Sequence, residues 1–449
     1  MSAHTLAGQV QEARAVLRGR RIGAIARTAC FNSASAAAAA LSGVIIARAV
    51  GPTVRGEYAA VISWFGVLLL VGEVGQSAAV CFYVARDPQR APGYVATSRA
   101  MMMVTGTFAL ASGLVLAPVL GHGIPGLTGA YRIAFAGSAI AFIGTSYTFS
   151  LQARSTERWN LVRVSQPALA LVAIVLLWRL GLLTLNTAIG VLLLTMTLQL
   201  GYAYYWCLRT GLARGRVQSR LVGCLVKYGL TQVAAVTPAA VNSYLDQLVL
   251  SQVVSPADLG RYAIAVSVTL VPVPVVSAIG NVAFPRLAAR RRDTAANGGG
   301  LRLAAAAVSA GIASAILLPI AASAYWLIPA VFGPAYQGAV PLLWILTPGG
   351  IFFACGQVVG DLLRGLSRPG LVATAQGLAA VSTVILIVAL LPVAGVSAAA
   401  IASTVAYGMA LAVMIRWLRR PPRSGPARRQ HERIASSGNP VKRDLRKEK

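Results

Sequence analysis

Two carboxylates lie inside long apolar stretches of the chain. Glu73 lies within LLLVGEVGQSAAV, and Asp246 lies within VNSYLDQLVLSQ. A charge at the centre of a bilayer costs roughly 2.5–3.5 kcal/mol on the insertion scale, so such groups usually face a cavity or a partner. In a cavity, each carboxylate could bind a proton or a cation, or balance a basic lining. The alternative is a buried structural carboxylate bonded to a neighbouring helix. Glu73 and Asp246 are the candidates for ion coupling.

Amide side chains accompany both carboxylates. Gln76 follows Glu73 by three residues, and Asn242 precedes Asp246 by four. In a continuous helix these spacings place the members of each pair on one face. Together with Asn32, in the first apolar stretch, these amides are candidates for contact with a polar substrate.

Arginines at the ends of apolar stretches are candidates for binding an anion. Arg27 and Arg48 bracket the first stretch. Arginine binds phosphate in a bidentate manner, so an anionic substrate such as a lipid diphosphate would favour several guanidinium groups in a cavity. The alternative is that these side chains snorkel to lipid headgroups. The same two interpretations apply to three further arginines: Arg132, Arg179 and Arg261.

The composition predicts that these residues are positioned by membrane-spanning helices. Of the 449 residues, 57% are hydrophobic and 12% are charged, whereas about 25% are charged in a soluble globular protein. This composition excludes a soluble enzyme. Because one span needs about 20 apolar residues, we predict an all-α polytopic protein with twelve transmembrane helices: 24–47, 58–84, 100–120, 131–152, 165–183, 187–208, 228–253, 261–284, 303–331, 338–360, 370–391 and 395–417.

The basic residues predict the orientation of these helices, because short cytoplasmic loops carry an excess of Lys and Arg. With the N-terminus in the cytoplasm, 35 of the 40 basic residues lie on the cytoplasmic side, including Arg163 in the loop before 165–183. Both termini are then cytoplasmic. The distribution also accounts for the net charge of +28 without nucleic acid as a partner.

Two internal similarities indicate a repeat. VGPTVRGEYAAVIS (50–63) resembles VSPADLGRYAIAVS (254–267), and Arg154, Arg158 and Gln166 correspond to Arg364, Arg368 and Gln376. The alternative is a pair of recurring turn types. A genuine repeat makes two parallel six-helix units about an axis along the membrane normal, which is a known transporter plan.

The predicted parts of the chain are a basic arm (1–23) with a possible interfacial helix, two lobes (24–208 and 228–417), a cytoplasmic linker (209–227) and a disordered basic tail (418–449).

Motifs for catalysis are absent from the sequence. There is no P-loop, GxSxG or HExxH pattern, the five cysteines form no CxxC pair, and the three histidines are scattered. We therefore expect no metal and no cofactor. All predicted loops are short, so a transporter is favoured over an enzyme.

Three segments resemble a known family. SGVIIARAVGPTVRGEYAAVIS (42–63), YLDQLVLSQVVSPADLGRYAIAVSV (244–268) and NVAFPRLA (281–288) are similar to bacterial polysaccharide-biosynthesis flippases. These belong to the multidrug/oligosaccharidyl-lipid/polysaccharide (MOP) exporter superfamily. The resemblance implies a MATE/MOP-like fold in which two six-helix bundles surround a lumen. It also implies that Arg27, Arg48, Glu73 and Asp246 occupy lumen positions.

The resemblance further implies a cargo and a location. The cargo is a polyprenyl-diphosphate-linked oligosaccharide, which moves from the inner to the outer leaflet of the bacterial cytoplasmic membrane by alternating access. Membrane lipids and polysaccharide assembly proteins are the partners implied.

Four alternatives stay open. A cation-coupled multidrug antiporter would need an acidic cavity with few basic residues. A lipid II flippase usually carries extra helices, and a membrane glycosyltransferase or polymerase would need a sizeable outer loop. A pure scaffold for glycan assembly would have no polar lumen.

Overall fold

The computed structural model describes residues 3–277, 298–366 and 368–419. Every regular element in these ranges is a helix, as expected where apolar segments must satisfy their backbone polar groups internally. The elements are α1 (Ala3–Gly72), α2 (Gln76–Arg86), α3 (Ala91–Leu120), α4 (Pro125–Arg154), α5 (Thr156–Arg179), α6 (Leu185–Arg209), η1 (Leu212–Arg214), α7 (Ser219–Asn242), α8 (Leu245–Val253), α9 (Pro256–Thr269), α11 (Gly298–Ala322), α12 (Ala324–Phe332), η2 (Pro334–Tyr336), α13 (Ala339–Gly365), α14 (Pro369–Ala394) and α15 (Ser397–Arg419).

Ten helices in the described part of the chain are long and apolar enough to cross a membrane. One of them, residues 27–72, contains most of the predicted span 24–47 and residues 58–72 of the predicted span 58–84. The two parts are joined at Gly51, where φ is 75°. The predicted span 228–253 is divided between α7 and α8, and neither is among the ten. The predicted span 303–331 is likewise divided between α11 and α12. The chain is a multi-pass membrane protein.

Two helix breaks contradict the prediction that each acidic residue shares a continuous helix with its amide. α1 ends at Gly72 and α2 begins at Gln76, with φ values of 49° at Val74 and 66° at Gly75. α7 ends at Asn242 and α8 begins at Leu245. Both acidic residues therefore lie at or beside the start of a new helix, and the helical-face argument does not hold at either position.

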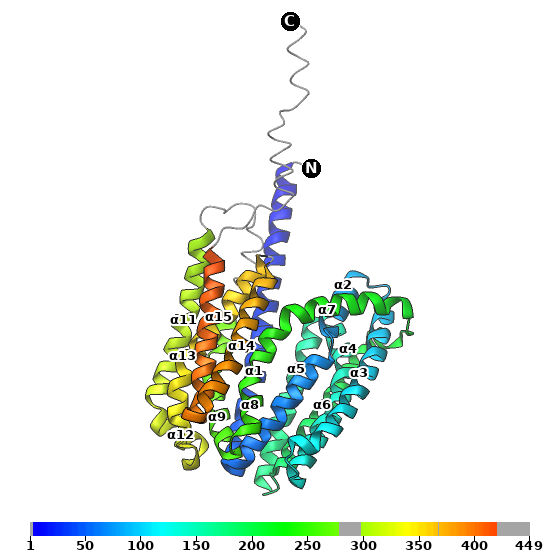
Figure 1. Cartoon of the computed structure of the whole chain (residues 1–449). Coiled ribbons are helices and arrows are strands. Elements are labelled where there is room, and N and C mark those ends of the chain that lie inside the picture. The colour runs from blue at the N-terminus through cyan, green and yellow to red at the C-terminus, as the bar shows by residue number, and fades with distance from the viewer. Residues whose placement is uncertain (1–2, 278–297, 367, 420–449) are drawn as a thin grey trace, which may run out of the picture.

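The helices form two bundles, one from α1–α6 and one from α8–α15, and α7 crosses between them (Figure 1). The same pairings recur in both: α4 packs on α6 as α13 packs on α15, and α1 packs on α5 as α7 packs on α14. These equivalent pairings agree with the internal similarity in the sequence.

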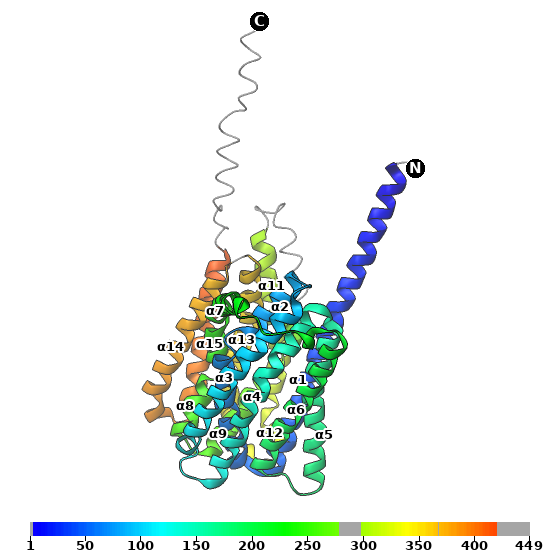
Figure 2. The ribbon, with the colours of Figure 1, turned by 90° about the vertical axis from the view of Figure 1, so that its right-hand side faces the viewer.

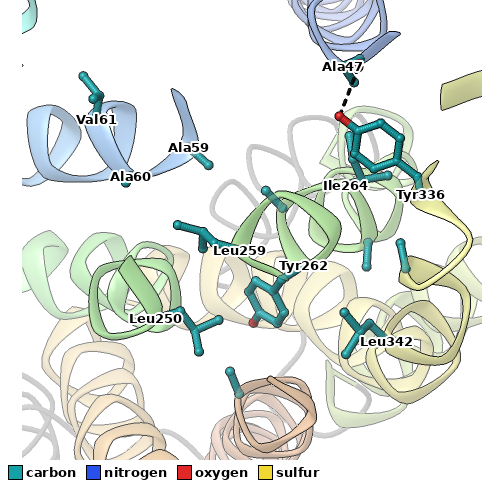
Figure 3. Close-up of a cluster of buried hydrophobic side chains, with 14 of the residues drawn as sticks. Ala47, Ala59, Ala60, Val61, Leu250, Leu259, Tyr262, Ile264, Tyr336 and Leu342 are labelled. Atoms are coloured by element: carbon teal, nitrogen blue, oxygen red, sulfur yellow. Dashed lines mark hydrogen bonds between the residues drawn. The ribbon is translucent and has the colours of Figure 1, made fainter. Parts of the chain in front are cut away.

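Among the described residues, the buried core is shared between the two bundles at one end of the molecule and divided between them at the other. We call the end at which α1 turns at Gly51 and α9 begins at Pro256 the hairpin end, and the end at which α15 stops the terminal end (Figures 1 and 2). At the hairpin end one large cluster combines residues of both bundles, among them Ala59 and Val61 of α1 and Leu259 of α9 (Figure 3). At the terminal end there are two clusters instead, one from residues 79–225 and one from residues 276–418.

Two glycines bring the backbones of α1 and α9 into contact at the hairpin end. A Cβ on Gly56 would overlap the carbonyl oxygen of Pro256 and lie 2.8 Å from the nitrogen of Gly260. A Cβ on Gly260 would overlap the carbonyl oxygen of Pro52 and lie 3.0 Å from the nitrogen of Gly56. Each PxxxG segment is thus seated on the other in a reciprocal manner, as small residues allow between membrane helices.

Some predictions concern residues outside the described ranges. These are the NVAFPRLA segment at 281–288 and residues 420–449 of the predicted basic tail. At the other end of the chain, α1 extends back to Ala3 and includes most of the predicted basic arm (1–23) (Figure 2).

Candidate functional site

Asp246 is the centre of a buried hydrogen-bonded cluster in the second bundle. Its side chain lies in the first turn of α8 and is 3% exposed. Tyr262 donates its hydroxyl to Oδ2 at 2.5 Å, Ser403 donates to the same oxygen at 3.3 Å, and the Gln247 backbone N–H donates to Oδ1 at 2.7 Å. The carboxylate also borders a cavity of ≈ 20 Å³ lined by Thr269, Tyr407 and others. A space of this size holds about one water molecule, so the cluster can hold or pass a proton.

Asn242 is also buried, but its amide is satisfied by α14. Its Nδ2 donates to Gln376 Oε1 at 3.3 Å, and its Oδ1 accepts from Thr383 at 3.4 Å. These bonds join the end of α7 to α14, which is a structural role for the amide in this conformation.

Glu73 caps a helix. It lies in the break between α1 and α2, and its Oε1 accepts a hydrogen bond from the Ser77 backbone N–H at 2.8 Å. The N–H groups in the first turn of a helix have no partner within the helix, and a carboxylate there is stabilised by the helix dipole. This geometry fits the structural alternative for Glu73 more closely than it fits a cavity ligand.

We expect Glu73→Ala to loosen the start of α2. Loss of a cap costs about 1 kcal/mol, so amide exchange at residues 76–80 should become about fivefold faster. Glu73→Gln keeps an acceptor oxygen and should change exchange less. Equal exchange in wild type and Glu73→Ala would exclude the capping role and return Glu73 to the candidates for ion coupling.

Gln76 lies in a polar contact between three helices of the first bundle. The side chain is fully buried, and its Oε1 accepts from Ser98 of α3 at 3.0 Å. Ser98 Oγ lies 3.0 Å from Ser146 Oγ of α4. Gln76 Nε2 is buried without a partner among the described residues, so its N–H groups remain available to a ligand or water.

Asn32 is paired with an arginine that the sequence analysis assigned to a cytoplasmic loop. Arg163 Nη1 donates to Asn32 Oδ1 at 3.1 Å, and one turn along, Asn160 Nδ2 donates to Thr28 Oγ1 at 2.9 Å. α5 begins at Thr156, nine residues before the predicted start at residue 165, and this places Arg163 within the helix. Arg163 also lines a cavity of ≈ 200 Å³ between α4, α5 and α6. The signal in the sequence was the helical pattern TERWNLVRVSQ, in which Arg163 follows the helix start by two turns.

Arg27 and Arg48 differ in their surroundings. Arg27 is exposed near the terminal end. Arg48, at the hairpin end, donates a hydrogen bond to the Ala330 carbonyl of α12. Beside it, Tyr336 donates to the Ala47 carbonyl at 3.0 Å (Figure 3). Burial raises the pKa of Tyr336 to about 12, so its hydroxyl stays a donor at neutral pH. Both bonds hold α1 to the second bundle.

The predicted site residues therefore lie in separate clusters. Among the described residues, no hydrogen bond or ion pair joins Glu73, Gln76 or Asn32 to Asp246. The described part of the chain also contains no group of three or more His, Cys, Asp or Glu that could hold a metal ion.

Comparison with known proteins identifies the family. Residues 25–290 match the family described as "Polysaccharide biosynthesis protein". No curated protein sequence matches the chain at a significant level.

Solved structures of MOP superfamily transporters share the fold. An inward-facing MATE multidrug resistance transporter aligns with a TM-score of 0.73 and 15% identity, covering 86% of this chain and 94% of that chain. The lipid II flippase MurJ in an inward closed conformation aligns with a TM-score of 0.71 and 11% identity, covering 87% of each. An outward-facing MATE transporter aligns with a TM-score of 0.62 and 16% identity, covering 88% of this chain and 94% of that chain.

Proposed function

Because the chain belongs to the polysaccharide biosynthesis protein family, we propose that it is a flippase for polyprenyl-diphosphate-linked oligosaccharide. The cargo moves from the inner to the outer leaflet of the bacterial cytoplasmic membrane, for export of a cell-surface polysaccharide. The saccharide occupies a polar lumen between the bundles while the lipid tail stays in the bilayer. The lipid-linked substrate of the MurJ flippase, whose fold is similar, supports this class of cargo.

The observation that carries the proposal is the distribution of the buried core. The bundles share one core at the hairpin end and have separate cores at the terminal end. A transporter with alternating access needs one end closed and the other able to part. The chain aligns with a higher TM-score to an inward-facing transporter (0.73) than to an outward-facing one (0.62). This difference supports a state that is closed at the hairpin end and open at the terminal end.

The proposed topology puts the terminal end in the cytoplasm. Counting α1 as two spans about Gly51 and α7–α8 as one broken span yields twelve spans from the ten candidate helices. The lobes are then residues 24–208 and 228–417. The excess of Lys and Arg in the loops of the terminal end supports this orientation.

The cavity beside Arg163 favours an anionic cargo over the cationic drugs of the alternative antiporter. It has one cationic and no acidic side chain among its lining residues. A cationic drug would be repelled there, whereas a diphosphate would be attracted. Asp246 is retained in this proposal as the residue for coupling to a proton or cation.

A cross-link between the bundles tests the mechanism. Ser63 of α1 donates to Gln247 of α8 at 3.1 Å across the hairpin end. Because Gln247 reaches this contact through a long side chain, a short reducible bis-thiosulfonate reagent is used to join Ser63→Cys to Gln247→Cys in a chain without its native cysteines. We expect this cross-link to reduce flipping in proteoliposomes at least about tenfold, and a reductant to restore it, because the lobes can no longer part there.

The control is a cross-link inside one bundle. Ser150 of α4 lies 3.5 Å from Cys207 of α6, so Ser150→Cys, in a chain that keeps Cys207 as its one native cysteine, can form a disulfide that leaves the bundles free. This variant should keep its flipping rate when oxidised. Full flipping by the cross-linked Ser63→Cys/Gln247→Cys protein would rule out rocking of the lobes.

A further inference from the structure

Arg163 is a cation within a membrane-spanning helix that has no carboxylate partner. In the described part of the chain, the ion pairs are Arg90–Asp87, Arg261–Asp258 and Arg364–Asp361, and none involves Arg163. Its guanidinium lies 4.4 Å from the ring centroid of Trp159 and donates one bond, to Asn32. Because a guanidinium has five N–H donors, most of its donors remain available. An uncompensated charge in a membrane helix is costly and marks a binding function.

The cavity beside Arg163 has the chemistry of a small oxyanion site. Its polar lining consists of the guanidinium, the hydroxyls of Thr145 and Thr148 and the amide of Gln199. Gln199 Nε2 donates to the Val162 carbonyl at 3.0 Å, which fixes its orientation beside Arg163. The remaining lining is apolar, from residues such as Ile140, Phe149 and Leu200.

The size of the cavity limits what it can hold. At ≈ 200 Å³ it is smaller than the roughly 300–1,000 Å³ of a pocket for a drug-sized ligand. It fits a charged headgroup fragment and not a whole oligosaccharide. The planar fork of an arginine matches phosphate oxygens in a bidentate arrangement.

We propose that this cavity binds phosphate oxygens, with Arg163 as the anchoring residue, and that its ligand is the diphosphate of the lipid-linked cargo. This assignment rests on the proposed function. Asn32 is a positioning residue, because its neutral oxygen holds the guanidinium in place without neutralising it. The diphosphate is then held by the first bundle, while the saccharide lies toward the second.

Asn32→Asp separates binding from folding. Aspartate has almost the same shape as asparagine and places a carboxylate 3.1 Å from Arg163. The new ion pair keeps or raises the thermal stability, but it neutralises the charge that attracts phosphate. A purely structural Asn32–Arg163 contact would therefore tolerate Asn32→Asp, whereas a phosphate site would not.

The test is direct binding to the full-length chain in nanodiscs of zwitterionic lipid, with farnesyl diphosphate, farnesol and inorganic pyrophosphate as probes. We expect both diphosphates to bind and farnesol to bind at least about tenfold more weakly. Arg163→Gln and Asn32→Asp should each weaken diphosphate binding about tenfold or more. The matched control is Arg158→Gln, which removes a guanidinium that stacks on Trp206 at 4.6 Å and does not line the cavity.

Three results would overturn the assignment. They are unchanged farnesyl diphosphate binding in Arg163→Gln and Asn32→Asp, farnesol binding equal to that of farnesyl diphosphate, and loss of the diphosphate signal when phosphatidylglycerol is added to the nanodiscs. The last result would identify a site for bulk lipid headgroups. Failure of the proposed function would give a different result from failure of this assignment. A strain lacking the protein would then keep a normal pool of lipid-linked glycan, while the purified protein would still bind pyrophosphate in a manner that depends on Arg163.

Discussion

Replacing Gly56 with leucine is expected to reduce transport about 100-fold. Even a Cβ at this position would overlap the carbonyl oxygen of Pro256, and backbone atoms cannot move aside as a flexible side chain does. The hairpin end of the two bundles could then close only by displacing α1 from α9. Overpacking costs about 1–3 kcal/mol where neighbours can relax, and each 1.4 kcal/mol is about tenfold in an equilibrium. We expect flipping in proteoliposomes to fall about 100-fold, and the pseudo-symmetric Gly260→Leu to have the same effect.

Closure of the hairpin end can be measured separately from the rate of transport. A single cysteine at Ala59, which is buried in the shared core, should be protected from a membrane-impermeant maleimide on the outer side in a chain that lacks the five native cysteines and is otherwise unchanged. With Gly56→Leu it should become labelled.

The matched control is Gly43→Ala, also in α1. A Cβ there meets nothing within 4 Å, so this change should leave both transport and labelling unaltered. Wild-type transport by Gly56→Leu would show that the hairpin end need not close in the cycle.

Asp246→Asn is expected to uncouple transport from its driving gradient. The carboxylate accepts hydrogen bonds from Tyr262 and Ser403, and it borders a cavity with room for about one water molecule. Asparagine keeps the shape and one acceptor oxygen, but it cannot take up or release a proton. We expect gradient-driven flipping to fall about tenfold or more, to the rate measured without a gradient, while the purified protein stays folded. Proteoliposomes with an imposed pH or sodium gradient measure this directly.

Two further variants separate coupling from stability. Tyr262→Phe removes one bond to Asp246 and should lower thermal stability, by about 1–3 kcal/mol for a buried acceptor that loses its partner, with coupling retained. Asp361→Asn removes a carboxylate of the same bundle that pairs with Arg364 at 2.7 Å. Transport by this variant should stay coupled to the gradient as in the wild type. An equal response to the gradient in Asp246→Asn and wild type would assign Asp246 a structural role.

The helical class and the positions of most spans were predictable, because apolar runs of about 20 residues have few alternatives in a membrane. The sequence also aligned the PxxxG segments at Pro52 and Pro256, and these segments contact each other through Gly56 and Gly260. Neither result needed information about tertiary packing.

The helix breaks were not predictable, because they depend on partners distant in sequence. A Cβ on Gly75 would overlap the carbonyl oxygen of Gly229, so the break before α2 is where another helix approaches its backbone. Hydropathy does not register such an approach. Glu73 was therefore predicted on a continuous helical face, when it caps a new helix.

Arg163 was missed for a different reason. The charge count assigned every arginine near a predicted helix end to a loop, and the start of α5 lies at Thr156 and not at residue 165. A shift of nine residues moved Arg163 from a loop into α5, a candidate membrane span. Its partner Asn32 was among the candidates, but only the fold brings the two together.

The central claim is that the chain moves a lipid-linked oligosaccharide, and the most direct measurement is of the cargo. Lipids extracted from a strain lacking the protein would be analysed by mass spectrometry for polyprenyl-diphosphate glycans, together with the surface polysaccharide. We predict that a complete lipid-linked repeat unit accumulates and that the surface polymer is lost. An unchanged lipid-linked pool with altered sensitivity to cationic drugs would contradict this account and favour the cation-coupled antiporter.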